Sequence, residues 1–133
     1  MEYIPEGHKN KPDSCLIGFI YLKDIGKCKV EVFDGNEENI PYFHIYNEDN
    51  SFHTCVCIYS NEYYNYNNKC KNRLSQEQCI QLNEWMKSIE SKFPYQSTNW
   101  FMCAFAWEVI VDRQEDFPKE YDRNKPTNYS III

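Results

Sequence analysis

The spacing of the hydrophobic residues changes near the middle of the chain. In the first half, Cys28, Val30 and Val32 alternate with Lys29 and Glu31, which is typical of a strand with one buried face. After residue 75, hydrophobic residues recur at intervals of three and four, which is typical of a helix. A sheet-forming half followed by a helix-forming half predicts an α+β fold in which the two kinds of element are segregated.

The first half predicts an antiparallel meander of four strands. The strands are expected at residues 16–22, 28–33, 40–46 and 52–59. Turn residues such as Asp, Asn and Gly separate these segments, and Gly18 within the first apolar run suggests a bulge. The segment 60–73 is rich in Asn and Tyr and has no periodic pattern, so we interpret it as a long loop that is either functional or mobile.

The second half predicts two helices that pack on the apolar face of the sheet. Ser75 and Gln78 have the spacing of a capping box at a helix N-terminus. The residues expected on the buried face of this helix are Cys79, Leu82, Met86, Ile89 and Phe93. A second helix is expected from a cap at Ser97 to Val111, with apolar residues around most of its girth.

Length and composition indicate a single domain. The chain has 133 residues, of which 42% are hydrophobic, which is enough for one core. We expect a flexible arm at residues 1–14, one α+β domain at 15–111 and an acidic tail at 112–133. Three isoleucines close the tail, and β-branched residues favour a C-terminal strand or a homodimer formed through Ile131–Ile133.

Charge and the N-terminal sequence limit the classes of partner. Lys and Arg number 14 against 20 Asp and Glu, which gives a net charge of −6. Negative charge repels a phosphate backbone, so we expect a protein partner with a basic surface and no direct binding to duplex nucleic acid. The sequence contains no apolar stretch of about 18 residues and no signal-peptide pattern. We therefore expect a cytoplasmic location and no membrane association.

Seven cysteines are many for a chain of this length. Their odd number and the absence of a signal peptide favour free thiols in a reducing compartment over a disulfide framework. Burial among apolar residues accounts for Cys15, Cys28, Cys79 and Cys103. No Cys-x-x-Cys pair is present to indicate a zinc ribbon or a redox motif.

The most informative candidate site is one face of the third and fourth strands. Pairing of Tyr46 with Ser51 across a loop at 47–50 places His44 opposite His53. This register gathers the apolar residues of both strands on one face, and burial therefore favours it over a one-residue slip. The residues expected on the other face are Tyr42, His44, Tyr46, His53, Cys55, Cys57 and Tyr59.

Three interpretations of this face remain open. His44, His53, Cys55 and Cys57 form a Cys2His2 set of the kind that zinc prefers, although a flat sheet needs a bulge or a ligand from a loop to complete such a site. The face can also be a semi-polar packing surface beneath the acidic tail or a helix. The third interpretation is a surface for a protein partner. Its expected residues are Tyr42, His44, Tyr46, His53, Tyr59, Tyr63, Tyr64 and Tyr66.

The segment around this face resembles a group of small uncharacterised proteins from bacterial genomes and prophages. Residues 40–45, Ile-Pro-Tyr-Phe-His-Ile, match that group's Pro-His-Phe-His-type strand, with Tyr42 in place of the first His. Residues 74–78, Leu-Ser-Gln-Glu-Gln, and the Trp-Met pair at 85–86 match its helix. The resemblance spans residues 38–90, and it implies a small α+β domain and a mobile-element setting in a bacterial host.

The sequence contains none of the common catalytic motifs. It has no Gly-rich phosphate loop, no G-x-S-x-G elbow and no H-E-x-x-H helix. We therefore predict a non-enzymatic protein-interaction module of phage or mobile-element origin, without a cofactor, such as an anti-CRISPR-like inhibitor of a host nucleic-acid-directed defence effector. The alternative is a zinc-binding protein or a small metal-dependent enzyme that uses His44, His53, Cys55 and Cys57.

Overall fold

A computed structural model shows a four-stranded antiparallel sheet in the order β1-β2-β3-β4. It describes residues 14–34, 40–64, 70–89, 97–111, 116–119, 122 and 125–132. The strands are β1 (Ser14–Leu22), β2 (Gly26–Phe33), β3 (Tyr42–Asn47) and β4 (His53–Cys57). The predicted meander is confirmed.

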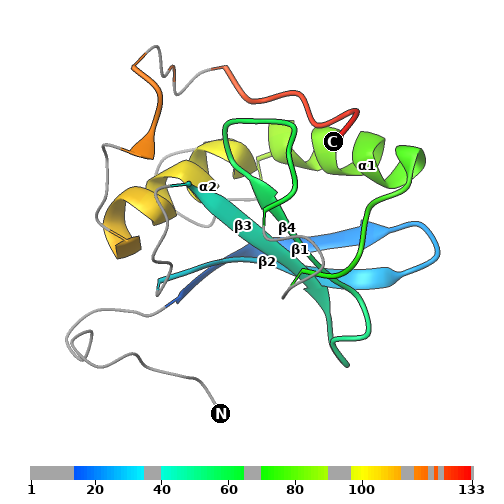
Figure 1. Cartoon of the computed structure of the whole chain (residues 1–133). Helices are drawn as coiled ribbons and strands as arrows, with labels where there is room; N and C mark the ends of the chain where they lie inside the picture. The colour runs from blue at the N-terminus through cyan, green and yellow to red at the C-terminus, as the bar shows by residue number, and fades with distance from the viewer. Residues whose placement is uncertain are drawn as a thin grey trace.

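Two α-helices lie over one face of the sheet (Figure 1). They are α1 (Gln76–Lys87) and α2 (Asn99–Ala106), and α2 continues into one π-helical turn, η1 (Trp107–Val111). The predicted α+β fold is therefore confirmed. No helix in the described part of the chain has the length and apolar character needed to cross a membrane.

The hairpin between β1 and β2 follows the expected local chemistry. Gly26 has a positive φ of 95° and Asp24 has a φ of 66°, and such left-handed conformations suit a tight turn formed by glycine and aspartate. The register shifts between Leu16 and Gly18, so the bulge expected near Gly18 is present. Beyond it, Cys28 and Ile20 are paired and buried.

The β3–β4 register differs by two residues from the predicted one. Tyr46 pairs with His53 and His44 pairs with Cys55. The reason lies in Asn47, whose backbone N–H donates to the Phe52 carbonyl at 3.2 Å and whose Oδ1 accepts from the Phe52 N–H at 2.9 Å. The loop therefore closes at 47 and 52 rather than at 46 and 51. A two-residue shift leaves every side chain on its predicted face, because side chains alternate along a strand.

Helix α1 begins as predicted and ends early. Ser75 and Gln78 form the expected capping box. The helix stops at Lys87, where Ser88 takes an extended conformation and its N–H donates to the Trp85 carbonyl at 3.0 Å. Ile89 is consequently 53% exposed and does not belong to the buried face. The predicted end at residue 93 lies outside the described residues.

Helix α2 has its N-cap one residue later than predicted. Thr98, rather than Ser97, occupies this position, and its Oγ1 accepts from the Phe101 N–H at 3.1 Å. Trp100 and Trp107 are fully buried beneath the helix and the turn that follows it. Helix α2 contacts α1, β1 and β2, which explains why apolar residues surround most of it.

The side-chain amide of Gln78 links α1 to the β1–β2 turn. Its Oε1 accepts from the Ser75 N–H at 2.8 Å and its Nε2 donates to the Lys23 carbonyl at 2.6 Å. A Gln78→Glu change keeps the cap acceptor but places a carboxylate oxygen against the Lys23 carbonyl. We expect it to lower the free energy of unfolding by about 1–3 kcal/mol, measured by urea denaturation.

Gln81→Glu is the matched control for this change. The Gln81 Oε1 only accepts a hydrogen bond from the Lys23 N–H, at 2.8 Å, and a carboxylate accepts it equally well. The two variants add the same charge to neighbouring turns of α1. Equal stability of the two variants would contradict the role assigned to the Gln78 amide.

The C-terminal segment packs into the core without forming a strand. Tyr129 is fully buried, and its ring meets the Phe43 ring edge-on at 5.8 Å. The Ile58 carbonyl accepts three hydrogen bonds, from the Tyr129 hydroxyl, from Trp100 Nε1 at 3.0 Å and from Thr127 Oγ1 at 2.9 Å. These buried contacts anchor the end of the chain beside the helices.

The predicted C-terminal strand is therefore wrong for the described residues 125–132, which have no strand conformation. The segment, red in Figure 1, runs back toward α1, where the Tyr129 N–H donates to Asn83 Oδ1 at 3.0 Å. This side-chain acceptor satisfies the Tyr129 N–H in place of a strand partner. Ile132 packs against the core, Ile131 is exposed, and residue 133 lies outside the described part.

Candidate metal centre

Four potential metal ligands converge on the face of the sheet opposite the helices. His44 on β3 lies directly across from Cys55 on β4, and His53 precedes Cys55 by two residues on the same strand. Cys70 joins them from the loop that follows β4. The ligand atoms of these four residues all lie within 4.8 Å of one another, so a single ion could contact all of them.

The backbone of the loop after β4 brings Cys70 to this position. The Tyr64 N–H donates to the Cys55 carbonyl at 2.9 Å, and the Asn72 N–H donates to the His53 carbonyl at 3.1 Å. The His53 N–H in turn donates to Asn72 Oδ1 at 2.9 Å. The segments on either side of residues 65–69 therefore run along the outer edge of β4 and place Cys70 beside Cys55.

The donor atoms form two bonded pairs, one of histidines and one of cysteines. A hydrogen bond joins His44 Nδ1 to His53 Nε2 at 2.8 Å, and a disulfide joins Cys55 to Cys70. Cys55 Sγ lies 3.4 Å from His44 Nδ1. Ligand atoms around a tetrahedral zinc ion are about 3.3–3.8 Å apart for Zn–N and Zn–S bonds of ordinary length. Side-chain movements of about 1 Å would therefore turn the cluster into a tetrahedral site.

Aromatic rings surround the two histidines. The Phe33 ring meets the His44 ring edge-on at 4.8 Å, and the Tyr42 ring lies 5.2 Å from it. The Tyr46 ring lies 5.7 Å from the His53 ring. Both histidines are half-buried, and burial lowers the pKa of His53, which favours the neutral imidazole that metals bind.

The hydroxyl of Tyr46, one of these aromatic rings, is itself hydrogen-bonded. The Tyr46 hydroxyl donates to a carboxylate oxygen of Glu31, on the strand beside β3. This bond fixes the ring that covers His53. The cluster therefore lies in a packed and largely apolar setting, where ligand orientation depends on the surrounding rings.

Three of the four ligands predicted from the sequence are brought together, and the fourth is replaced. Cys57 lies at the end of β4, opposite Tyr42, and its thiol hydrogen-bonds the Ser60 side chain. Burial raises the pKa of the Cys57 thiol. Cys57 lies four residues beyond His53 on β4, about 13 Å along the strand, which is too far for its short side chain to converge with the others, whereas a loop can supply a ligand from the side.

Sequence reasoning missed Cys70, although a signal was present. Apolar neighbours explain four of the seven cysteines as core residues, but Cys70 follows Asn67, Asn68 and Lys69 in a polar segment. A cysteine in such a setting has no obvious packing role and is 1% exposed in the structure. The expectation of free thiols alone is also corrected, because one disulfide is present and five cysteines are free.

The tyrosines expected to bind a partner make contacts within the chain. The half-buried members are Tyr42, Tyr46, Tyr59, Tyr63 and Tyr64. Tyr42 stacks on Tyr64 with 4.0 Å between ring centroids, and the Leu74 N–H donates to the Tyr63 hydroxyl at 2.7 Å. Tyr66 lies outside the described residues. Binding of a partner by this set stays a prediction.

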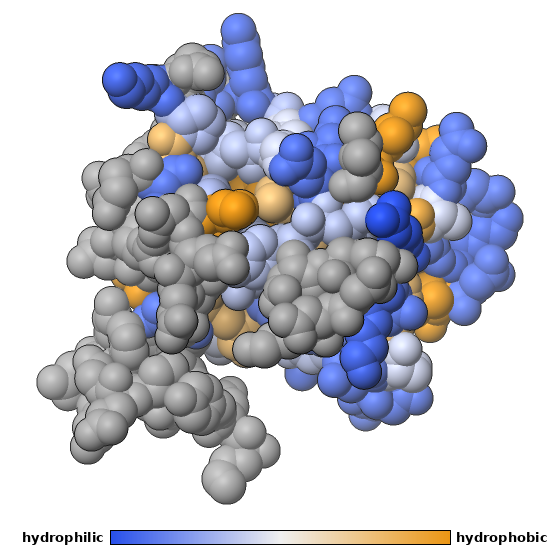
Figure 2. Space-filling view, viewed as in Figure 1, coloured by the Kyte–Doolittle hydropathy of each residue, from blue (hydrophilic) through white to orange (hydrophobic). Residues whose placement is uncertain are grey.

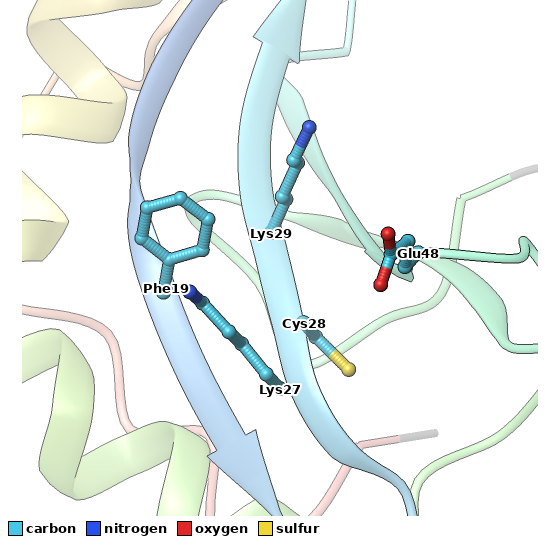
Figure 3. Close-up of a pocket in the computed structure, with 5 residues that line it drawn as sticks. All are labelled: Phe19, Lys27, Cys28, Lys29 and Glu48. Atoms are coloured by element: carbon cyan, nitrogen blue, oxygen red, sulfur yellow. The ribbon is translucent and has the colours of Figure 1, made fainter.

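A shallow cavity of about 260 Å³ lies near the β1–β2 turn and is a weaker candidate site. Its lining residues are Phe19, Lys27, Cys28, Lys29 and Glu48. Figure 3 shows the Lys27 side chain turned toward the Phe19 ring, with its ammonium 4.3 Å from the ring centroid. Both lysines are exposed, so the cavity presents no buried polar group that could fix a ligand.

The surface viewed in Figure 2 offers no broad apolar patch. Hydrophilic residues cover most of its described part, and apolar residues form small separate spots. Scattered apolar residues of this kind are normal for a protein surface. Among the residues that the structure describes, the four-ligand cluster is the feature with the most specific chemistry.

Comparisons with protein-family models, curated proteins and solved structures find no match for this chain. The resemblance to the prophage group stays a prediction. The functional argument rests on the geometry of the cluster.

Proposed function

We propose that the chain is a zinc-binding protein in which His44, His53, Cys55 and Cys70 form a Cys2His2 centre. The observation that carries this proposal is the convergence of the four donor atoms within 4.8 Å. Two imidazoles and two thiolates suit zinc, whereas calcium and magnesium prefer oxygen ligands. The fourth ligand comes from a loop, which is the element that a flat sheet needs to complete a compact site.

The proposed role of the ion is structural. Four protein ligands fill a tetrahedral zinc site and leave no position for a substrate or an activated water molecule. Zinc would tie β3 and β4 to the loop that carries Cys70, 15 residues beyond Cys55. A metal-dependent enzyme needs an open coordination position, so this donor set favours the zinc-binding alternative over the enzymatic one.

The predicted interaction module, with its phage origin and inhibitor role, is compatible with this proposal. A structural metal ion stabilises the surrounding surface whichever partner that surface meets. A basic protein partner and a homodimer through the C-terminal residues stay predictions.

Cys70→Ser is expected to abolish zinc binding. Reduced protein purified without an affinity-metal step should carry about one zinc equivalent, and the Cys70→Ser variant less than about a tenth, because a tetrahedral site that loses a thiolate binds zinc far more weakly. Metal content is measured by plasma mass spectrometry and folding by circular dichroism.

Cys57→Ser is the matched control, because Cys57 is also buried and lies two residues from Cys55. It should retain about one equivalent of zinc. If Cys57→Ser loses zinc and Cys70→Ser retains it, the ligand is Cys57, as strand alternation predicted. That result would overturn the ligand set that contains Cys70. Zinc-free wild-type protein, or full zinc in both variants, would sink the proposal itself.

A further inference from the structure

The two sulfurs of the candidate metal centre can also bond to each other. Cys55 and Cys70 form a disulfide with a Cα–Cα distance of 5.3 Å, within the range of about 4.4–6.8 Å found for disulfides. Each sulfur can be a zinc thiolate or half of a disulfide, but not both at once. The same four residues therefore have two mutually exclusive states.

We propose that oxidation of Cys55 and Cys70 to a disulfide expels the zinc ion, which makes the centre a reversible redox-responsive site. This inference rests on the zinc-binding function proposed above. The ligand class is a thiolate-bound divalent zinc ion, and the oxidant class is a low-molecular-weight disulfide such as oxidised glutathione. The sheet and the loop are the same in both states, and only the side chains of the centre rearrange.

The backbone supports both states without moving. The hydrogen bonds from Asn72 to His53 and from Tyr64 to Cys55 hold the loop beside β4 through main-chain atoms, which neither state alters. Two thiolates on one zinc ion are about 3.8 Å apart, so disulfide formation needs a small rotation of two side chains. The conversion therefore carries little conformational cost.

The histidines have a partner after the metal leaves. When the ion leaves, two half-buried imidazole rings lose their ligand bonds. Leaving their nitrogen atoms without a hydrogen-bond partner would cost free energy. His44 Nδ1 and His53 Nε2 lie 2.8 Å apart, so one ring donates to the other. The metal-free state keeps these polar atoms satisfied, which makes it a stable state of the folded protein.

Burial alone does not separate the remaining cysteines from Cys55 and Cys70, which are also buried. What separates them is that Cys55 and Cys70 lie side by side, with a Cα–Cα distance of 5.3 Å, and are thiolates when they ligate zinc. Burial raises the pKa of Cys28 to about 11 and raises that of Cys103 further, so their thiols stay protonated and unreactive near neutral pH. Oxidation is therefore expected at the Cys55–Cys70 pair.

The chemistry balances in two exchange steps. One zinc-bound thiolate attacks a sulfur of the small disulfide, whose S–S bond breaks as one small thiolate leaves. The second protein thiolate then attacks the protein sulfur of the mixed disulfide, which forms the Cys55–Cys70 bond and expels the second small thiolate. Two electrons pass from the protein sulfurs to the small disulfide. The disulfide sulfurs carry no negative charge, so Zn²⁺ loses two of its ligands and is released.

The experiment uses the full chain, reduced and loaded with zinc. Oxidised glutathione is added, released zinc is followed with a chromophoric chelator, and the disulfide is located by peptide mass spectrometry. We expect about one zinc ion released for each Cys55–Cys70 bond formed, with full reloading after dithiothreitol and zinc are added. Cys57→Ser should release zinc in the same way.

The outcomes separate the inference from the function on which it rests. Failure of the reduced wild-type protein to load zinc would overturn the proposed function. Normal loading followed by retention of zinc, or by oxidation of other cysteines, would overturn the redox inference alone. Release that dithiothreitol and zinc do not reverse would also contradict a reversible site.

Discussion

Replacement of Tyr129 by alanine is expected to lower the free energy of unfolding by about 3–5 kcal/mol. The side chain is fully buried against Phe43, and its hydroxyl donates to the Ile58 carbonyl. Removing the ring leaves a cavity beneath the C-terminal segment and takes away one donor. Urea denaturation followed by tryptophan fluorescence measures the loss.

Two further variants divide this effect into its parts. Tyr129→Phe removes only the hydroxyl, and because Trp100 and Thr127 still donate to Ile58, we expect a loss of about 1 kcal/mol. Ile131→Ala, at a side chain 68% exposed, should change stability by less than about 0.5 kcal/mol. If Tyr129→Ala is as mild as Ile131→Ala, the end of the chain does not pack as the structure shows.

Removal of zinc from the reduced protein is expected to lower the free energy of unfolding by about 4 kcal/mol when free zinc had exceeded its dissociation constant about a thousandfold. The reason is that the complete ligand set exists only in the folded state, so metal binding stabilises that state. Thermal denaturation in dithiothreitol, with and without a strong chelator, measures the difference.

His53→Ala supplies the control for the chelation experiment. It removes one of the four converging donors, so its melting temperature should be low and insensitive to the chelator. A chelator effect of equal size in this variant would place the responsible metal elsewhere. Identical melting of the wild-type protein in both conditions would argue against a structural zinc ion.

The sequence alone predicted those parts of the fold that depend on neighbours along the chain. The buried and outward faces of β3 and β4 follow from alternation, and they survived a two-residue error in register because the strand repeat is two. The start of α1 follows from Ser75 and Gln78, which are close in sequence. The same alternation placed three of the four candidate ligands on one face before any contact was known.

The remaining features were decided only by contacts between distant residues. Cys70 reaches the centre because Asn72 pairs with His53 across the edge of β4, and no local pattern encodes that pairing. Tyr129 packs in the core instead of joining a strand because Ile58 and Asn83 offer it hydrogen-bond acceptors. Local periodicity depends on the geometry of one element, whereas a loop ligand or a terminal anchor depends on where separate elements meet, and that is determined only when the whole chain packs.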